Sequence, residues 1–355
     1  MKKKGIFKMK NMTKLAALAS AAALMLSLAG CGAAPASSGS AASASASGSS
    51  AEGTIQVSIV QPMSHTSLDQ IRETIISELE AAGRSDIQVS AQNANGDTSA
   101  LATILQKEKA NGADIIVPIA TSAAQSAKSV FEGSDTPIVF AAVSDPVAAG
   151  LTGDDCANIT GVSNNIPSAE IVKLISNFQP DYQKIGFLYT SSETNSVSTI
   201  TAAKAYCDDN GIAYEETSIA SASDLSAGVN SLLSKGVDAL YTGNDNTIAS
   251  AMPAYTDIAY SKQVPIYCGA DSMVADGGFA TIGVDYVQLG KQVAQLVLKV
   301  ADGAEPSSLP YETLSDYARY VNLQAADTLG LTLTDQMLDG YTVLVEKDGT
   351  SHFGQ

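Results

Sequence analysis

The 355-residue chain contains no tryptophan and only two histidines, His65 and His352. Without tryptophan, a sugar site would have to stack its ligand on tyrosine or phenylalanine instead. No second histidine or cysteine lies at metal-ligand spacing from either histidine, so the sequence predicts no metal site. The GxSxG, HExxH, Walker A and GxGxxG patterns are absent as well. We therefore expect a protein that is not an enzyme and carries no cofactor, with an exported enzyme as the least supported class.

Basic side chains are scarce relative to acidic ones. Lys and Arg number 20 against 37 Asp and Glu, which gives a formal net charge of −17. This excess of acid argues against nucleic acid and anionic lipid as partners. It is typical of an exported protein that its charge keeps soluble and monomeric.

Long apolar runs are also missing, apart from a short one near the N-terminus. Six lysines precede or border the apolar segment Leu15–Leu28, which is shorter than the roughly 20 residues that span a bilayer and is followed by Ala29, Gly30 and Cys31. Leu-Ala-Gly-Cys resembles the bacterial lipobox. We predict a lipoprotein signal peptide (residues 1–30), a lipid on Cys31 that anchors the protein outside the cytoplasm, and a flexible Ala/Ser/Gly linker (residues 31–53). An ordinary secretory signal is the alternative.

Cysteine usage gives little sign of disulfides. Beyond Cys31, the chain has only Cys156, Cys207 and Cys268, an odd number without CxxC spacing. A domain of this size does not need disulfides for stability. We expect buried thiols, and the spacing selects no pair.

Two stretches of the chain, Gly112–Ala127 and Gly236–Ala251, are related at an offset of 124 residues. Each is expected to form a buried strand, a loop of small or polar residues and the start of a helix. The first loop is neutral, whereas the second carries Asp245. Two related βα units with complementary loops suggest two lobes that close on a small molecule bearing both signs of charge.

Strand and helix patterns alternate along the chain from Thr54, which predicts an α/β fold with parallel sheets and right-handed crossovers. The alternation pauses after a strand at Asn158–Ser163 and restarts after Pro167. The helix Tyr286–Val300 is expected to return to the first lobe. We therefore predict one lobe of residues 54–163 plus about 285–312, and a second of residues 164–284 plus about 313–350.

Loops that follow the predicted strands form the candidate site, because ligands of parallel sheets bind beyond the carboxyl ends of the strands. None of these loops contains Lys or Arg, which disfavours a phosphate or polyanion. A carboxylate would accept N–H bonds from the helix start at Thr121–Ala123, and an ammonium would pair with Asp245 first, or with Glu193 or Asp271. The candidate ligand-binding residues are Ser64, His65, Thr121, Ser122, Ala123, Ser144, Asp145, Glu193, Asn195, Ser196, Asp245, Asn246 and Asp271.

Each candidate also has a purely structural interpretation. Ser, Thr and Asp are preferred helix N-caps, so Thr121, Ser122 and Asp245 could simply cap the helices that follow them. Asp145 stands before a proline, a pattern typical of turns. His65 has no partner for catalysis and is expected in the wall of the cleft or in an exposed loop.

Short motifs along the whole chain resemble those of one family. They are His65 with Leu68-Asp69, Asn93-Ala94 with Gly96-Asp97, Ala123-Ala-Gln125, Val143-Ser-Asp145-Pro146, Asn158-x-Thr-Gly161-Val, Gly186-Phe-Leu-Tyr189, Glu193-x-Asn195-Ser-Val197, Asp245-Asn-Thr-Ile, Asp271-Ser-Met273, Gly290 and Val321-Asn322. In this order, from about Thr54 to Leu331, the chain resembles the substrate-binding lipoproteins of ABC importers that include tryptophan- and tyrosine-type uptake components. Met63-Ser-His65-Thr66 departs from the family's more usual Glu-His-Pro run.

The resemblance implies a type I periplasmic-binding-protein fold, with two Rossmann-like lobes joined by three hinge crossovers. It also implies an amino acid or similar small ligand, aromatic in some members, that is delivered to an ABC permease. A sensory lipoprotein of the same fold is an alternative role, and a sugar or nucleoside-like molecule is an alternative ligand.

Overall fold

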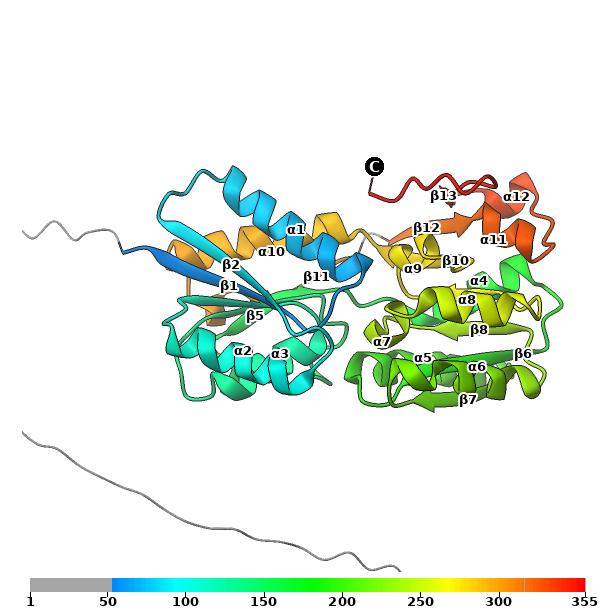
Figure 1. The fold of residues 1–355 in the computed structure, drawn as a ribbon, viewed down its shortest axis with the longest axis horizontal. Coiled ribbons are helices and arrows are strands. Elements are labelled where there is room, and N and C mark those ends of the chain that lie inside the picture. Colours follow the sequence, from blue (N-terminus) through cyan, green and yellow to red (C-terminus); the bar gives the residue numbers. More distant parts are fainter. Residues whose placement is uncertain (1–52, 316, 355) are drawn as a thin grey trace, which may run out of the picture. The chain divides into compact units, whose positions relative to one another are not determined.

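The computed structural model describes residues 53–315 and 317–354 (Figure 1). The predicted signal peptide, Cys31 and all but the last residue of the predicted linker therefore lie outside the described residues. Within the described ranges, no helix is both long and apolar enough to cross a membrane. Cys156, Cys207 and Cys268 are buried free thiols.

The first lobe is built on a six-stranded sheet in the order β11-β5-β4-β3-β1-β2. Helices α1 and α10 pack together on one face, and α2 and α3 on the other (Figure 1). The elements are β1 (Ile55–Gln61), α1 (Thr66–Ala81), β2 (Ile87–Asn93), α2 (Thr98–Ala110), β3 (Ile115–Pro118), α3 (Thr121–Val130), β4 (Ile138–Ala141), β5 (Ile159–Ser163), α10 (Tyr286–Ala301) and β11 (Glu312–Thr313). Strands β3, β4 and β5 are buried along their whole length, as expected for parallel strands covered on both faces.

The second lobe is built on a seven-stranded sheet in the order β13-β12-β10-β9-β8-β6-β7. Helices α4 and α5 pack together, as do α6 and α8. The elements are α4 (Ser168–Phe178), β6 (Lys184–Thr190), α5 (Thr194–Asn210), β7 (Ala213–Ile219), α6 (Leu225–Ser234), β8 (Ala239–Thr242), α7 (Asn246–Ala249), α8 (Met252–Tyr260), β9 (Ile266–Cys268), α9 (Asp271–Ala275), β10 (Ala280–Val284), β12 (Tyr317–Asn322), α11 (Leu323–Thr328), α12 (Asp335–Leu338) and β13 (Thr342–Val345).

The predicted α/β class with two parallel sheets is confirmed, with one exception. Strand β12 runs antiparallel to β10, pairing Ala280 with Val321. Strand β11 runs parallel to β5, and β12 follows it directly, without a helix to carry the chain to the far end of the second sheet. Strand β12 therefore begins beside the carboxyl end of β10, where Tyr317 pairs with Val284, and runs in the opposite direction.

The two related stretches of sequence, Gly112–Ala127 and Gly236–Ala251, occupy equivalent positions in the two sheets. Strand β3 lies between β1 and β4, and β8 lies between β6 and β9, so the two orders match. Gly112 and Gly236 both have positive φ values, +77° and +71°, after the helix that precedes each strand. The helices that follow differ: α3 is continuous, whereas α7 ends after one turn and α8 begins at Met252.

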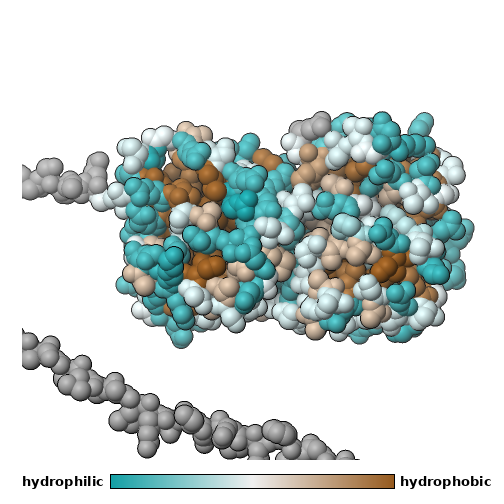
Figure 2. Space-filling view, viewed as in Figure 1, coloured by the Kyte–Doolittle hydropathy of each residue, from teal (hydrophilic) through white to brown (hydrophobic). Residues whose placement is uncertain are grey.

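The chain passes between the sheets at three places within the described ranges, after β5, after β10 and after β11. The second passage leads into α10, which packs on α1 at Gly290, where a Cβ atom would lie 2.7 Å from Thr74 Cβ. The face seen in Figure 2 is largely hydrophilic, with hydrophobic side chains in separate areas. In the described part of the chain, the exposed large apolar residues are Val147, Val197, Tyr311 and Tyr317, of which Val147 is the most exposed.

Candidate ligand-binding site

Loops from both lobes line a cavity with about 370 Å³ of space not filled by protein atoms, part of it open to solvent. Most of its lining follows the carboxyl ends of β1, β4, β6, β8 and β9, the edge at which parallel sheets bind ligands. The lining residues are His65, Ser67, Leu68, Ala142, Ser144, Asn164, Asn195, Asn244, Asp245, Asn246, Ala249, Ala270, Met273 and Tyr286.

Side chains of the two lobes bond each other directly around this cavity. His65 Nε2 lies 3.1 Å from Asn246 Oδ1, and Thr66 Oγ1 donates to Asp276 Oδ2 at 3.0 Å. Ser198 Oγ donates to Asp145 Oδ2 at 2.7 Å. These bonds join residues 53 to 210 positions apart in the chain, so they form only when the lobes meet.

Five of the thirteen predicted site residues line the cavity: His65, Ser144, Asn195, Asp245 and Asn246. The other eight lie elsewhere, namely Ser64, Thr121, Ser122, Ala123, Asp145, Glu193, Ser196 and Asp271. Asp145 caps its own turn at Ala148 N and bonds Ser198, and Ser196 Oγ donates to Asp245. Several predicted polar residues therefore hold the walls of the cavity in place without facing it.

Asp245 is almost completely buried, and both of its oxygens are occupied by the protein. Oδ1 accepts from Thr190 Oγ1 and Ile248 N, each at 2.9 Å, and Oδ2 accepts from Thr190 N and Ser196 Oγ, each at 2.6 Å. Burial and the charge of Glu193 raise the pKa of Asp245 to about 7, against the lowering effect of these bonds. Four donors fill its lone pairs, so Asp245 ties the loop after β8 to the loop after β6 and caps α7.

Glu193 also acts on the start of α7 rather than on the cavity. Its carboxylate accepts from the backbone N–H groups of Asn246 and Thr247, at 3.0 and 2.8 Å, and from both of their side chains, each at 2.7 Å. A carboxylate placed at a helix start satisfies N–H groups that have no partner inside the helix. Glu193 therefore fixes the position of Asn246, which does line the cavity.

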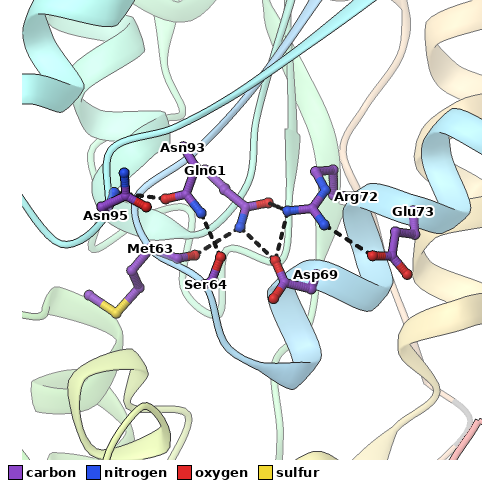
Figure 3. A network of polar contacts seen from close by, with 8 residues as sticks. All are labelled: Gln61, Met63, Ser64, Asp69, Arg72, Glu73, Asn93 and Asn95. Atoms are coloured by element: carbon purple, nitrogen blue, oxygen red, sulfur yellow. Dashed lines mark hydrogen bonds and ion pairs between the residues drawn. The ribbon is translucent and has the colours of Figure 1, made fainter.

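A network of polar contacts braces the loop between β1 and α1, the loop whose sequence includes His65 (Figure 3). The buried Gln61 donates from Nε2 to Met63 O at 3.0 Å and to Asp69 Oδ1 at 2.8 Å. Arg72 Nη1 bonds Gln61 Oε1 and Asp69 Oδ1, at 2.9 and 2.7 Å. Ser64 is exposed and accepts from Asn93 Nδ2 at 2.6 Å, so it braces this loop from outside the cavity.

The start of α3, predicted to bind a carboxylate, does not line the cavity. Thr121 and Ala123 are buried, and the preceding Ala120 has φ +73° and ψ 161°, a strained conformation for a residue with a side chain. Ala142, at the end of the neighbouring strand β4, has φ +57° and does line the cavity. The unusual backbone therefore lies at the carboxyl edge of the sheet, and the residues that line the cavity there belong to the next loop.

Sequence reasoning missed nine lining residues: Ser67, Leu68, Ala142, Asn164, Asn244, Ala249, Ala270, Met273 and Tyr286. Asn244 precedes Asp245 in the loop after β8, which the sequence predicts as part of the site. Met273 belongs to the Asp271-Ser-Met273 motif. Asn164 and Tyr286 lie at the crossovers, and Asn164 Nδ2 lies 3.3 Å from Tyr286 OH. Crossover residues carry no local pattern, and only proximity between the lobes identifies them.

In the described part of the chain, no group of three His, Cys, Asp or Glu side chains is arranged to hold a metal ion.

Asp271→Asn is expected to stabilise the protein at pH 8 and to have little effect near pH 4. Burial raises the pKa of Asp271 to about 7, and in the described part of the chain its carboxylate accepts a hydrogen bond from Ser272 N, at 2.7 Å. An unfolded Asp has a pKa near 3.9, so between about pH 4 and 7 the folded state binds a proton that the unfolded state has lost. Stability from this group therefore falls as the pH rises through that window.

Above the window the ionised, buried carboxylate costs up to about 4 kcal/mol, which the amide avoids. Thermal melts of wild type and Asp271→Asn at pH 4, 6 and 8 measure the effect. A stability difference that stays constant across these pH values would show that Asp271 does not titrate in this way.

Known proteins resemble this chain over most of its length. Residues 56–342 match a family described as ABC transporter substrate binding protein. A tyrosine-binding protein of Clostridioides difficile (strain R20291) is 31% identical over 272 residues, which are 75% of this chain and 78% of that protein. A crystal structure of an ABC domain in complex with L-Trp, from Streptococcus pneumonia, is 33% identical with a TM-score of 0.77, covering 82% of this chain and 99% of that one. The ligand-free, open structure of a substrate-binding protein with adhesive properties from Clostridium difficile is 30% identical with a TM-score of 0.62, covering 81% and 98%.

Proposed function

Because this chain belongs to the family of ABC transporter substrate-binding proteins, we propose that it captures an amino acid, most suitably an aromatic one, in the cavity between its lobes. The family and its type I periplasmic-binding-protein fold agree with the sequence-based identification. The role of this family is substrate binding for transport, not catalysis. The ligand is a small molecule, and its identity is the subject of the proposal.

The observation that carries the proposal is a cavity lined from both lobes at the carboxyl ends of the strands. Relatives with at least 30% identity are described as tyrosine-binding and as bound to L-Trp. At similar identity, this chain superposes better on the L-Trp complex than on the open, ligand-free relative. A ligand that contacts both lobes shifts the population toward the closed form, which is the physical basis of capture.

A thermal-shift screen with the twenty amino acids, nucleobases and common sugars tests the ligand class. L-tryptophan or L-tyrosine is expected to raise the melting temperature most, because a ligand at a hundredfold excess over its Kd stabilises the fold by about 2.7 kcal/mol. A shift with sugars or nucleobases and none with amino acids would refute the amino-acid assignment. It would support the alternative ligand class instead.

We further propose that the mature chain is a monomer anchored outside the cytoplasm by a lipid on Cys31, and that its closed form docks on a permease. The Leu-Ala-Gly-Cys motif and the Ala/Ser/Gly run after it support the anchor. The mass of the N-terminal peptide of the mature protein tests for the lipid. An adjacent pair of permease and ATPase genes would support import, and a neighbouring sensor gene would support the sensory alternative.

A further inference from the structure

Two atoms in the cavity wall are buried and have no hydrogen-bond partner in the protein. In the described part of the chain, six buried side-chain polar atoms lack a partner, and two of them, His65 Nδ1 and Asn244 Oδ1, belong to residues that line the cavity. Buried polar atoms are almost always paired, so two unpaired atoms at one cavity indicate groups that a ligand satisfies. One of them comes from each lobe.

The hydrogen bonds around His65 determine which of its ring nitrogens carries the proton. Asn246 Nδ2 lies 2.7 Å from Glu193 Oε2, and a carboxylate accepts hydrogen bonds, so the nitrogen of this amide faces Glu193. The amide oxygen, Oδ1, therefore faces His65 Nε2 at 3.1 Å. An amide oxygen only accepts, so Nε2 must carry a hydrogen. In a neutral imidazole, the lone pair is then on Nδ1.

Burial keeps this imidazole in its neutral form. It lowers the pKa of His65 below the ordinary value of 6.5. The bond to Asn246 and the charges of Glu193, Asp69 and Asp276 act in the opposite direction but have the smaller effect. Asn246 belongs to α7, Glu193 to the loop after β6, Asp69 to α1 and Asp276 to the segment after α9. All four segments pack around the ring. His65 Nδ1 is therefore a hydrogen-bond acceptor at neutral pH.

The orientation of Asn244 follows from similar reasoning. Its Nδ2 donates to Asn164 O at 3.3 Å, which leaves Oδ1 as the free acceptor. Its backbone carbonyl accepts from Asn195 Nδ2, which fixes the loop that carries it. The cavity thus presents two neutral acceptors of fixed orientation.

We propose that His65 Nδ1 and Asn244 Oδ1 together accept hydrogens from the ammonium group of the ligand, one acceptor from each lobe. An ammonium has three N–H donors, so it can serve both acceptors, whereas an indole or a phenol has one donor only. The inference rests on the proposed function. It takes the place of the three carboxylates that the sequence suggested, because the oxygens of Asp245 and Glu193 already bond the protein and Asp271 does not line the cavity. A ligand without an amine would leave both acceptors buried and unpaired. A site built to bond a polar group discriminates most strongly against ligands that lack that group.

Isothermal titration calorimetry at pH 7.5 tests this with two matched ligand pairs. The first is L-tryptophan with indole-3-propionate, and the second is L-tyrosine with 3-(4-hydroxyphenyl)propionate, which differ only in the amine. We expect wild type to prefer the amino acid at least a hundredfold. His65→Phe keeps the ring volume and removes both nitrogens, and it should reduce this preference at least tenfold. His352→Phe, at the other histidine, is the control and should keep the wild-type ratio.

The ratio of the two dissociation constants within a ligand pair is the quantity that tests the inference. Loss of the interlobe bond to Asn246 would weaken the binding of both ligands of a pair by the same factor. Only loss of a contact to the amine changes the ratio of their affinities. Asn244→Leu keeps a similar side-chain volume and removes the acceptor, so it should lower the preference as His65→Phe does. In wild type, affinity for the amino acid should fall once the pH drops below the lowered pKa of His65, because a protonated ring would point an N–H at the ammonium. His65→Phe should remove this contribution and leave only the pH dependence that comes from Asp245, which also lines the cavity and has a pKa of about 7.

The outcomes separate the inference from the proposed function. If wild type binds an amino acid but its ratio is near one, or if His65→Phe leaves the ratio unchanged, the inference is wrong and the proposed function stands. If wild type binds neither amino acid of the two pairs, the aromatic-amino-acid function and the inference are both overturned.

Discussion

Asp245→Asn is expected to lower the free energy of unfolding by about 2–4 kcal/mol at pH 7. Each carboxylate oxygen of Asp245 accepts one backbone N–H, from Ile248 on Oδ1 and from Thr190 on Oδ2. Whichever way the amide of Asn is turned, its NH₂ group faces one of these two N–H donors. Hydroxyl groups can rotate and accept a hydrogen bond instead, but a backbone N–H cannot. Removing a buried charge offsets part of the cost without restoring the lost acceptor.

Urea or thermal unfolding at pH 7, with Asp271→Asn as the matched control, measures this effect. Both carboxyl groups are buried and both have a pKa raised to about 7, yet their hydrogen bonding differs. We expect opposite signs, with Asp245→Asn destabilising and Asp271→Asn neutral or stabilising. Equal effects would mean that burial outweighs the hydrogen bonds at Asp245, and its assignment as a structural tie between loops would fail.

Gly269→Ala is expected to weaken L-tryptophan binding at least thirtyfold and to lower stability by about 2–3 kcal/mol. Gly269 follows β9, and a Cβ atom there would lie 2.5 Å from Gly243 C, 2.6 Å from Asn244 N and 2.6 Å from Asn244 Oδ1. Two of these atoms are backbone and cannot rotate away. The loop after β8 would have to move, and with it the unpaired oxygen that we assign to the ligand.

Gly283→Ala is the matched control for this substitution. Gly283 lies in β10 of the same sheet, and a Cβ atom there would meet no atom closer than 3.7 Å, an ordinary contact. Calorimetry gives the affinities of both variants, and chemical unfolding gives their stabilities. Wild-type affinity in Gly269→Ala would show that the loop with Asn244 adapts without cost and does not position the ligand.

The order and type of the main elements could be predicted from the sequence because their patterns are local. The strand expected at Asn158–Ser163 is found as β5, Ile159–Ser163, and the helix expected at Tyr286–Val300 as α10, Tyr286–Ala301. Apolar runs and amphipathic spacing are visible within a few helical turns or a single strand. The apolar runs also predict which strands are buried on both faces. The direction of β12 was missed, because strand direction depends on how the chain crosses between the sheets.

The candidate site was only partly predictable. Several of the loops that the sequence predicts for the site line the cavity, at the edge where parallel sheets bind ligands. It could not tell which polar side chains face the cavity. Asp245 was interpreted as the partner of an ammonium, yet Thr190 and Ser196, which are 55 and 49 residues away, use its oxygens. Cap-forming and ligand-binding aspartates have the same local sequence, so only their tertiary partners distinguish them.

The sequence by itself determined an α/β chain with two related halves, with binding loops free of cationic side chains and rich in Asp, Asn, Ser and Thr, because composition and periodicity are properties of short segments. Only the tertiary structure decided how these loops are used. His65 and Asn246 are 181 residues apart, and their contact fixes the tautomer of the histidine. The protonation and pairing of a side chain depend on the atoms packed around it, and the fold brings those atoms together from distant parts of the chain.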